Sequence, residues 1–364
     1  MAHTVSIPLA AAHAKAQPAA TAFTVVRASR VSQAALAALG ATTFLVASMP
    51  WWAETALMRT AVEFLYFLAL AQMWNLLAGY GGLGSFGQQA FVGLGGYALV
   101  VFALKLGLNP FLSVLLGGLV CGLIAMPVSR LLFRLQGAYF AVGTWVVAEV
   151  FRLLIANVAW LGGGSGVSIT SVMQEMDAWW RDALTLWMAL ALGSGSLLAV
   201  FLLLRSRLGL GLTAVRDSEP AAESIGISVP RLKFWVYVIA AVGFGLAGGL
   251  IFLTKLRISP DSAFAIHWTI TVVFIVVIGG LGTIEGPLIG TIVYFLLRDT
   301  LADYGSWYLI AFGLLAIAVM LLMREGLWGC VRNRFGIELF PVQRRLRHPA
   351  LKAMGGKVRE GKLT

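Results

Sequence analysis

Charge is scarce in this sequence, and that scarcity says more about the protein than any other feature. Only 12% of the 364 residues are charged, whereas 59% are apolar, and the mean hydropathy is +0.87. A soluble chain of this size would need many more charges, so the composition predicts an all-α fold, a polytopic transmembrane helical bundle. Outer-membrane β-barrels are excluded, because the apolar runs are continuous rather than alternating.

Several patterns that carry chemistry are also missing. The two cysteines, Cys121 and Cys330, fall in a predicted span and just beyond the last one, so they indicate neither a disulfide framework nor a metal site. No Gly-x-x-x-x-Gly-Lys-Ser/Thr loop is present, so this chain cannot hydrolyse ATP by the usual phosphate-loop route. The predicted spans contain no metal-binding cluster and no nucleophile–base spacing. A membrane-embedded enzyme therefore has little support, and we expect no cofactor in this chain.

The apolar residues fall into about ten segments that can cross a bilayer as helices, and a count of eight or nine also fits the pattern. The predicted spans are residues 33–50, 60–78, 88–105, 110–126, 137–159, 183–204, 234–254, 266–281, 286–302 and 307–323. They form a transmembrane domain over residues 33–323. An Ala-rich N-terminal tail (1–32) without a signal-peptide pattern precedes it, and we expect this tail to be disordered and cytoplasmic. A basic tail (324–364) follows, which we also expect to be cytoplasmic.

Lysine and arginine predict how the bundle is oriented. With both termini in the cytoplasm, the cytoplasmic side collects twenty of the 27 basic residues and the opposite side six, while Arg152 lies within a span. Positive residues prefer the cytoplasmic side, so this distribution favours that orientation. Because the basic residues cluster in loops and at the C-terminus, the net charge of +11 points to topology and anionic lipid, and we expect no nucleic-acid partner. The pairs Trp51–Trp52 and Trp179–Trp180 then mark the outer interface.

The loop 205–233 carries eight charged residues between two apolar spans that carry none. Asp217 or Ser218 is a plausible N-cap, Pro220 fits a first helical turn, and Gly226 is a helix stop. These signals predict about two helical turns over residues 219–225, with acidic side chains near the positive end of the helix. Such a short helix needs a surface to pack on, so the loop is either a solvated connector or a docking element.

The residues of this loop resemble the cytoplasmic coupling segment of the branched-chain amino-acid permease family of bacterial ABC importers. The stretch 214–233 (AVRDSEPAAESIGISVPRLK) matches the family pattern at Arg216, Glu219, Ala221, Ala222, Gly226, Ile227 and Lys233. Three further segments resemble Gly-rich stretches of that family in order. They are residues 79–91 (GYGGLGSFGQQAF), 162–167 (GGGSGV) and 277–287 (VIGGLGTIEGP). Where the family commonly has a histidine in the first of these, this chain has Gln88 or Gln89.

The resemblance implies a multi-pass permease of the bacterial inner membrane that translocates branched-chain amino acids or a similar small polar solute. Its partners would be two ATPase subunits, which bind the ATP, a second homologous permease and an extracytoplasmic solute-binding protein that delivers solute at the 161–182 loop. The coupling residues would be Arg216, Glu219, Ala221, Ala222, Glu223 and Gly226. The resemblance leaves open whether the solute is a branched-chain amino acid, urea, an amide or an aromatic acid, and whether the two permeases are identical.

Two groups of residues are candidates for the translocation path. Residues 79–87 are too rich in glycine to form a straight helix without cost, and broken backbone at membrane depth is tolerated where it lines a cavity. This favours Ser85, Gln88 and Gln89 as path-lining residues, with an interfacial loop as the alternative. Glu149 and Arg152 share a helix face and are either a structural ion pair or the border of a path for a zwitterionic solute.

A different class of function also fits a polytopic bundle. A gradient-driven secondary carrier or channel needs an intramembrane carboxylate that binds the coupling ion, and Glu149 is the candidate for that role.

Paired glycines four residues apart, such as Gly118 and Gly122 or Gly245 and Gly249, are interpreted as packing seams. The repeat of GGLGS (81–85) as GGLGT (279–283) records either a duplicated half or glycine richness alone.

Overall fold

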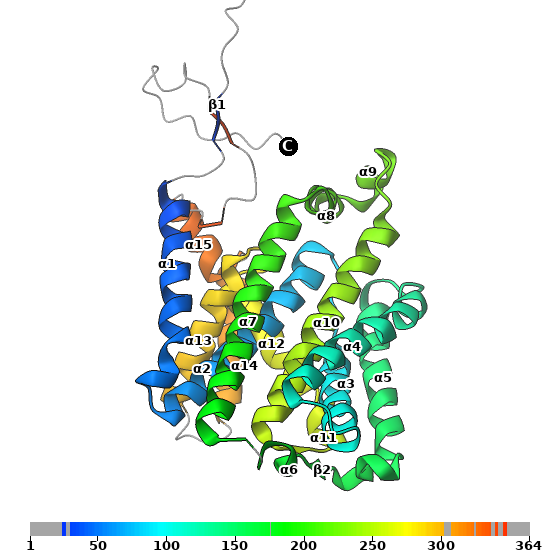
Figure 1. Cartoon of the computed structure of the whole chain (residues 1–364). Coiled ribbons are helices and arrows are strands. Elements are labelled where there is room, and N and C mark those ends of the chain that lie inside the picture. The colour runs from blue at the N-terminus through cyan, green and yellow to red at the C-terminus, as the bar shows by residue number, and fades with distance from the viewer. Residues whose placement is uncertain are drawn as a thin grey trace, which may run out of the picture.

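The computed structural model describes residues 24–26, 30–174, 176–301, 307–323, 325–335, 339–340 and 345–347. Within them the chain folds into a bundle of helices that run roughly side by side (Figure 1). The helices that build the bundle are α1 (Arg30–Ala47), α2 (Thr55–Asn75), α3 (Gln89–Leu99), α4 (Pro110–Leu132), α5 (Gly137–Ala156), α7 (Ala178–Arg205), α10 (Val229–Lys255), α12 (His267–Gly279), α13 (Glu285–Leu301) and α14 (Trp307–Leu322).

Shorter elements connect these helices. They are the helices α6 (Thr170–Gln174), α8 (Arg207–Asp217), α9 (Glu219–Ser224), α11 (Pro260–Ala263) and α15 (Gly326–Phe335), the 3-10 turns η1 (Met49–Trp51), η4 (Ala159–Leu161) and η5 (Gly163–Ser165), and the π-helical turns η2 (Leu76–Tyr80) and η3 (Val100–Lys105). Two antiparallel strand pairs complete the set. Strand β1 (Thr24–Val26) pairs with β4 (Arg345–Arg347), and β2 (Val167–Ser168) pairs with β3 (Arg257–Ile258), with Val167 opposite Ile258.

Each of the ten predicted spans coincides with one of the bundle helices, so the predicted polytopic helical bundle is confirmed. Within the described residues, eight helical stretches are long and apolar enough to cross a membrane alone. The stretch Gln89–Lys105 is apolar but shorter, and the irregular segment 81–88 precedes it. Most of the predicted tails 1–32 and 324–364 lies outside the described residues, and their extents stay predictions.

Local signals explain why α4 begins where it does. Asn109 caps the helix, since its Oδ1 accepts hydrogen bonds from the N–H groups of Phe111 (2.9 Å) and Leu112 (3.4 Å). Pro110 follows at the first helical position, where the missing N–H has no intrahelical partner to lose. The predicted start of this span at residue 110 is therefore correct.

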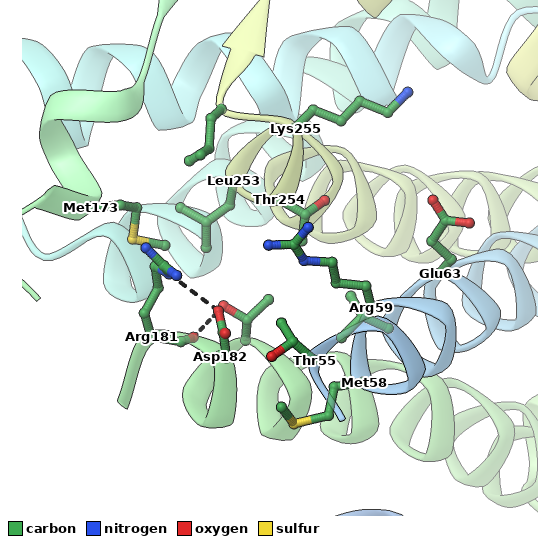
Figure 2. Close-up of a pocket in the computed structure, with 13 residues that line it drawn as sticks. Thr55, Met58, Arg59, Glu63, Met173, Arg181, Asp182, Leu253, Thr254 and Lys255 are labelled. Atoms are coloured by element: carbon green, nitrogen blue, oxygen red, sulfur yellow. Dashed lines mark hydrogen bonds and ion pairs between the residues drawn. The ribbon is translucent and has the colours of Figure 1, made fainter. Parts of the chain in front are cut away.

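The two ends of the bundle carry different elements. Helices α8 and α9 project from one end, while α6, α11 and the β2–β3 pair lie at the other (Figure 1). The predicted tryptophans gather beside the start of α7, where the rings of Trp51 and Trp179 lie 5.9 Å apart and those of Trp179 and Trp180 4.9 Å apart. The same region holds a pocket between the first turns of α2 and α7 and the last turn of α10 (Figure 2).

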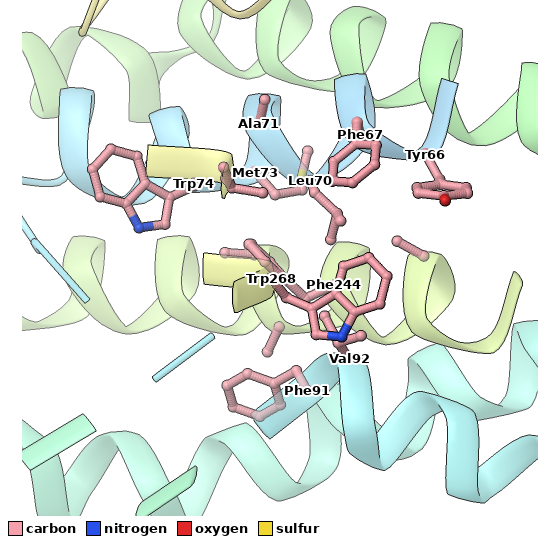
Figure 3. Packing of buried hydrophobic residues seen from close by; sticks show 14 of the residues in the cluster. Tyr66, Phe67, Leu70, Ala71, Met73, Trp74, Phe91, Val92, Phe244 and Trp268 are labelled. Atoms are coloured by element: carbon pink, nitrogen blue, oxygen red, sulfur yellow. The ribbon is translucent and has the colours of Figure 1, made fainter. Parts of the chain in front are cut away.

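Helices α2 and α10 form the centre of the bundle. In the 18-residue apolar window of each helix, 78% of the residues of α2 and 83% of those of α10 are buried, against 11% in the window of α1 at the edge. Figure 3 shows Phe67, Leu70 and Trp74 of α2 packed near Phe244 of α10 and Phe91 of α3. In lipid no water is expelled when helices meet, so close van der Waals packing holds such a core together.

The glycine pairs lie where the sequence predicts packing seams. Gly118 and Gly122 of α4 face α10, and a Cβ added to Gly245 of α10 would lie 2.6 Å from the Sγ of Cys121. A Cβ on Gly290 of α13 would lie 1.9 Å from the carbonyl oxygen of Ile275 on α12. Both seams are therefore confirmed, and both lie within this chain.

Candidate functional site

The loop between α7 and α10 forms a hairpin of two helices, α8 and α9. Ser218 caps α9, because its Oγ accepts a hydrogen bond from the Ala221 N–H at 3.4 Å, and Pro220 lies in the first turn. The helix ends before Gly226, whose φ of +86° belongs to the left-handed region that favours glycine. The predicted two-turn helix, its cap and its stop are confirmed.

Helix α8 was not expected from the sequence. Its buried residues are Gly209, Gly211, Leu212 and Val215, while Arg216 and Asp217 at its end are exposed. Leu212 and Val215 are three apart between charged positions, which is the signal of a helix packed on one side. Two glycines in eleven residues weaken that signal, because glycine lowers helix propensity.

Helix α9 presents one side to the bundle and the other to its surroundings. Ala222 is 2% exposed and joins the hydrophobic core, whereas Ala221 and Glu223 are exposed. Ile225, directly after the helix, is 72% exposed. Glu223 and Ile225 thus lie on the side of the hairpin that faces away from the bundle, and the sequence did not single out Ile225.

An ion pair fastens α9 to the first turn of α10. The Nζ of Lys233 lies 2.6 Å from Oε1 of Glu219, and the two side chains are 18% and 47% exposed. Arg216 lies near the Gly-rich segment 277–287, since a Cβ on Gly282 would be 3.7 Å from the Nη1 of Arg216. The hairpin therefore rests on α10 and on the Gly-rich loops rather than standing free.

The Gly-rich segments 79–91 and 277–287 meet in the bundle, since a Cβ on Gly79 would lie 2.6 Å from the backbone nitrogen of Gly282. Asn75 of α2 accepts a hydrogen bond from the Gly282 N–H at 2.8 Å and donates one to the Thr283 carbonyl at 2.7 Å. Gln72 donates to the Ile284 carbonyl at 2.7 Å. Irregular backbone inside a membrane protein needs such partners, and these two amides of α2 supply them.

Ser85, Gln88 and Gln89 are almost completely buried in this conformation. Gln88 Nε2 donates to Ser85 Oγ at 3.1 Å, and Gln89 Oε1 accepts a hydrogen bond from Thr269 Oγ1 at 2.5 Å. Gln88 Oε1 has no hydrogen-bond partner among the residues that the structure describes. That oxygen is an acceptor in the centre of the bundle that a water or a solute could use.

Glu149 and Arg152 form the ion pair that the sequence suggested. Arg152 Nε lies 2.9 Å from Glu149 Oε1, and its Nη1 lies 2.6 Å from Asp261 Oδ1 on α11. Asp261 was missed, because nothing in the sequence links position 261 to a residue more than a hundred positions earlier. Arg152 thus bridges two carboxylates near the end of the bundle opposite α9.

The structure does not bring the two groups of path candidates into direct contact. They are connected through α5, where Thr144 Oγ1 accepts a hydrogen bond from the Phe86 N–H at 3.1 Å. Glu149 follows five residues later, about 7.5 Å along the helix axis. Within the described part of the chain, no cluster of histidine, cysteine, aspartate or glutamate could hold a metal ion.

Comparisons with known proteins extend over the bundle and the α8–α9 hairpin. A sequence model of the family described as branched-chain amino acid transport system / permease component matches residues 56–324. The high-affinity branched-chain amino acid transport system permease proteins LivM of Salmonella typhimurium and Escherichia coli are each 25% identical over 319 residues, covering 81% of this chain and 75% of theirs. The fructose import permease protein FruG of Bifidobacterium longum is 27% identical over 128 residues, which is 33% of this chain and 37% of that protein. No solved structure matches significantly.

The matched range runs from the second residue of α2 to the end of α14 and contains the three Gly-rich segments and residues 214–233. Permeases of this kind are multi-pass proteins of the bacterial inner membrane and the membrane components of ABC importers, not enzymes themselves. The chain belongs to the branched-chain amino-acid transport system permease family.

Proposed function

We propose that this chain is the permease subunit of an ABC importer that translocates branched-chain amino acids, or a chemically similar small polar solute. The work is supplied by ATP that separate ATPase subunits bind and hydrolyse. Both termini and the α8–α9 hairpin face the cytoplasm in this proposal, as the distribution of lysine and arginine favours.

The observation that carries the proposal is the α8–α9 hairpin. Its inner side is anchored through Ala222 and the Glu219–Lys233 ion pair, while Glu223 and Ile225 on its outer side are exposed. A short helix that is held by the bundle but offers one side to the aqueous phase suits a docking element for a motor protein. Closure of the ATPases would move α9 and switch the bundle between outward- and inward-facing states.

The remaining partners are proposed from the surfaces that the bundle leaves free. The lipid-side residues of α5, such as Tyr139, Val146 and Leu154, are exposed, which supports a second homologous permease or membrane lipid against this helix. The loop 161–182, at the end opposite α9, would receive solute from an extracytoplasmic binding protein. The path would run past Ser85, Gln88 and Gln89 and past the Glu149–Arg152 pair.

The names of the relatives support the proposed substrate only in part. The LivM proteins are named for branched-chain amino acids and FruG, which matches a third of this chain, for fructose. The longer match to the LivM proteins favours an amino acid. Glu149 already pairs with Arg152, which leaves less room for it to bind a coupling ion and speaks against a secondary carrier.

Transport by the reconstituted complex tests the proposal. Proteoliposomes that contain the permeases, the ATPases and the binding protein should accumulate radiolabelled leucine when ATP is present on the ATPase side. Replacing Glu219 and Ala222 by glycine should leave ATP hydrolysis intact and reduce uptake, because the docking helix loses its anchors. Uptake that persists without ATPases and collapses with the proton gradient would instead establish a secondary carrier.

A further inference from the structure

A pocket of about 330 Å³ lies at the end of the bundle opposite the α8–α9 hairpin. It is enclosed by the first two turns of α2, the start of α7, the last turn of α10 and Met173 of α6 (Figure 2). Its volume falls at the lower end of the range for small-molecule sites, about 300–1,000 Å³. Met173, Arg181 and Asp182 come from or adjoin the loop proposed to receive solute from the binding protein.

The polar part of the pocket contains charges of both signs. Arg181 Nε and Asp182 Oδ1 lie 3.2 Å apart, and Figure 2 shows the Arg59 side chain reaching toward them from α2. Among the residues that the structure describes, no carboxylate lies within ion-pair distance of Arg59. The remaining carboxylate of the lining, Glu63, is engaged by Arg298 at 2.8 Å.

The other side of the pocket is apolar. Met58, Val62, Met173 and Leu253 line it, and each of these side chains is at most 9% exposed. No aromatic ring contributes to the lining within the described residues. A solute that fits this arrangement needs one positive group, one negative group and an aliphatic part.

We infer that this pocket binds a zwitterionic α-amino acid with an aliphatic side chain as it enters the permease. Arg59, with Arg181, takes the carboxylate, Asp182 accepts hydrogen bonds from the ammonium group, and the aliphatic chain lies against Met58, Met173 and Leu253. A simple anion would meet repulsion from Asp182, and a simple amine would meet repulsion from Arg59. This inference rests on the proposed function and names the part of the chain that recognises the substrate.

Helix α10 connects this pocket to the docking element. Its last turn supplies Leu253 and Lys255 to the pocket lining, and its first turn holds Lys233, which pairs with Glu219 of α9. The 27 residues of α10 span about 40 Å between the two sites. The Lys255 ammonium lies 4.6 Å from the ring centroid of Trp268 and extends away from the middle of the pocket in Figure 2. Among the described residues that line the pocket, Arg59 is thus the cation that has neither an ion-pair partner nor a ring partner.

Equilibrium binding to the complex of permeases and ATPases in nanodiscs, without the binding protein, tests the inference. Radiolabelled leucine is the probe, and 4-methylpentanoate, which lacks the ammonium group, and isoamylamine, which lacks the carboxylate, are the competitors. Arg59→Gln should weaken leucine binding about tenfold or more, as expected for one lost charge-assisted hydrogen bond. It should also reduce discrimination against isoamylamine, and Asp182→Asn should reduce discrimination against 4-methylpentanoate.

Two controls keep the outcome interpretable. Arg257→Gln removes an exposed cation of the same end that lies outside the pocket, and it should leave binding unchanged. Asp182→Glu should recover the discrimination lost in Asp182→Asn, which excludes a folding defect as the cause. Unaltered discrimination in both pocket variants, or an equal loss in Arg257→Gln, would overturn the inference while ATP-driven leucine uptake by the wild-type complex still upheld the proposed function. Absence of that uptake would instead refute the function itself.

Discussion

At the scale of single residues, glycines determine how closely the central helices approach one another, because they carry no side chain. A Cβ on Gly248 of α10 would lie 2.1 Å from the carbonyl oxygen of Val92 on α3, whereas nothing lies within 4 Å of a Cβ on Gly195 of α7. Gly248→Ala must therefore push α3 and α10 apart, and overpacking of this kind costs about 1–3 kcal/mol. We expect a lower thermal unfolding temperature for the purified protein with Gly248→Ala and no decrease with Gly195→Ala. Equal effects of the two changes would contradict the packing described for α10.

Substitution of Asn75 tests whether polar side chains of α2 hold the Gly-rich segment 277–287 in place. Asn75→Leu removes its two hydrogen bonds to Gly282 and Thr283 and leaves buried backbone groups without partners, at a cost of about 1–3 kcal/mol. Asn157→Leu is the matched control, because Asn157 is exposed and bonds only to the Leu153 carbonyl of its own helix. Thermal unfolding should detect a loss in the first variant alone. Similar stability of both variants would mean that the loop does not depend on α2.

The candidate site was predictable from the sequence only where its signals are local. The cap and stop of α9 are set by Ser218, Pro220 and Gly226, which lie within nine residues, and the structure has them as predicted. Asp261 beside Arg152 and Thr269 beside Gln89 depend instead on tertiary packing. A single sequence holds no signal for contacts that join residues more than a hundred positions apart.

At the scale of elements, the proposed coupling depends on the link between α9 and α10. Glu219→Lys or Lys233→Glu alone places like charges in contact, whereas the two changes together restore an ion pair of reversed sign. Such partly exposed pairs contribute about 0.2–1 kcal/mol, so we expect each single change to lower leucine uptake per ATP hydrolysed by several-fold and the double change to recover most of it. ATPase and uptake rates measured on the same proteoliposomes give this ratio.

Failure of the double change to restore coupling would have a different meaning from failure of the single changes to reduce it. In the first case Glu219 would contact the ATPase directly, and its pairing with Lys233 would be incidental. In the second case the α9–α10 link would carry no force, and the proposed role of this ion pair would be wrong.

The helices of the membrane domain were more predictable than the elements between them. Continuous apolar segments can satisfy their backbone only as helices inside a bilayer, so their existence follows from composition alone. The π-helical turns η2 and η3, the β2–β3 pair and α8 were not anticipated, because these short elements depend on neighbours that the local sequence does not specify. Helix α8 in particular needs the surface under Leu212 and Val215 to compensate for its glycines.

At the scale of the whole molecule, the buried helix α10 connects the proposed docking element to the proposed solute pocket. The charged hairpin lies at one end, the pocket around Arg59 and Asp182 lies at the other, and α10 reaches both. Because most residues of α10 are buried among its neighbours, displacement of its first turn would also move α2, α3 and α4. In the proposed mechanism, a force applied at α9 switches the solute path of the permease.

Site-specific photocrosslinking of the assembled importer tests whether α9 docks on an ATPase subunit. A photoreactive residue at Glu223, on the outer side of α9, should capture an ATPase subunit, and the yield should change between the ATP-bound and nucleotide-free states. The same photoreactive residue in place of Trp160, which is 57% exposed in the turn η4 shortly before strand β2, should capture no ATPase. Capture from position 160 but not from position 223 would contradict the account, as would the absence of any ATPase adduct at position 223.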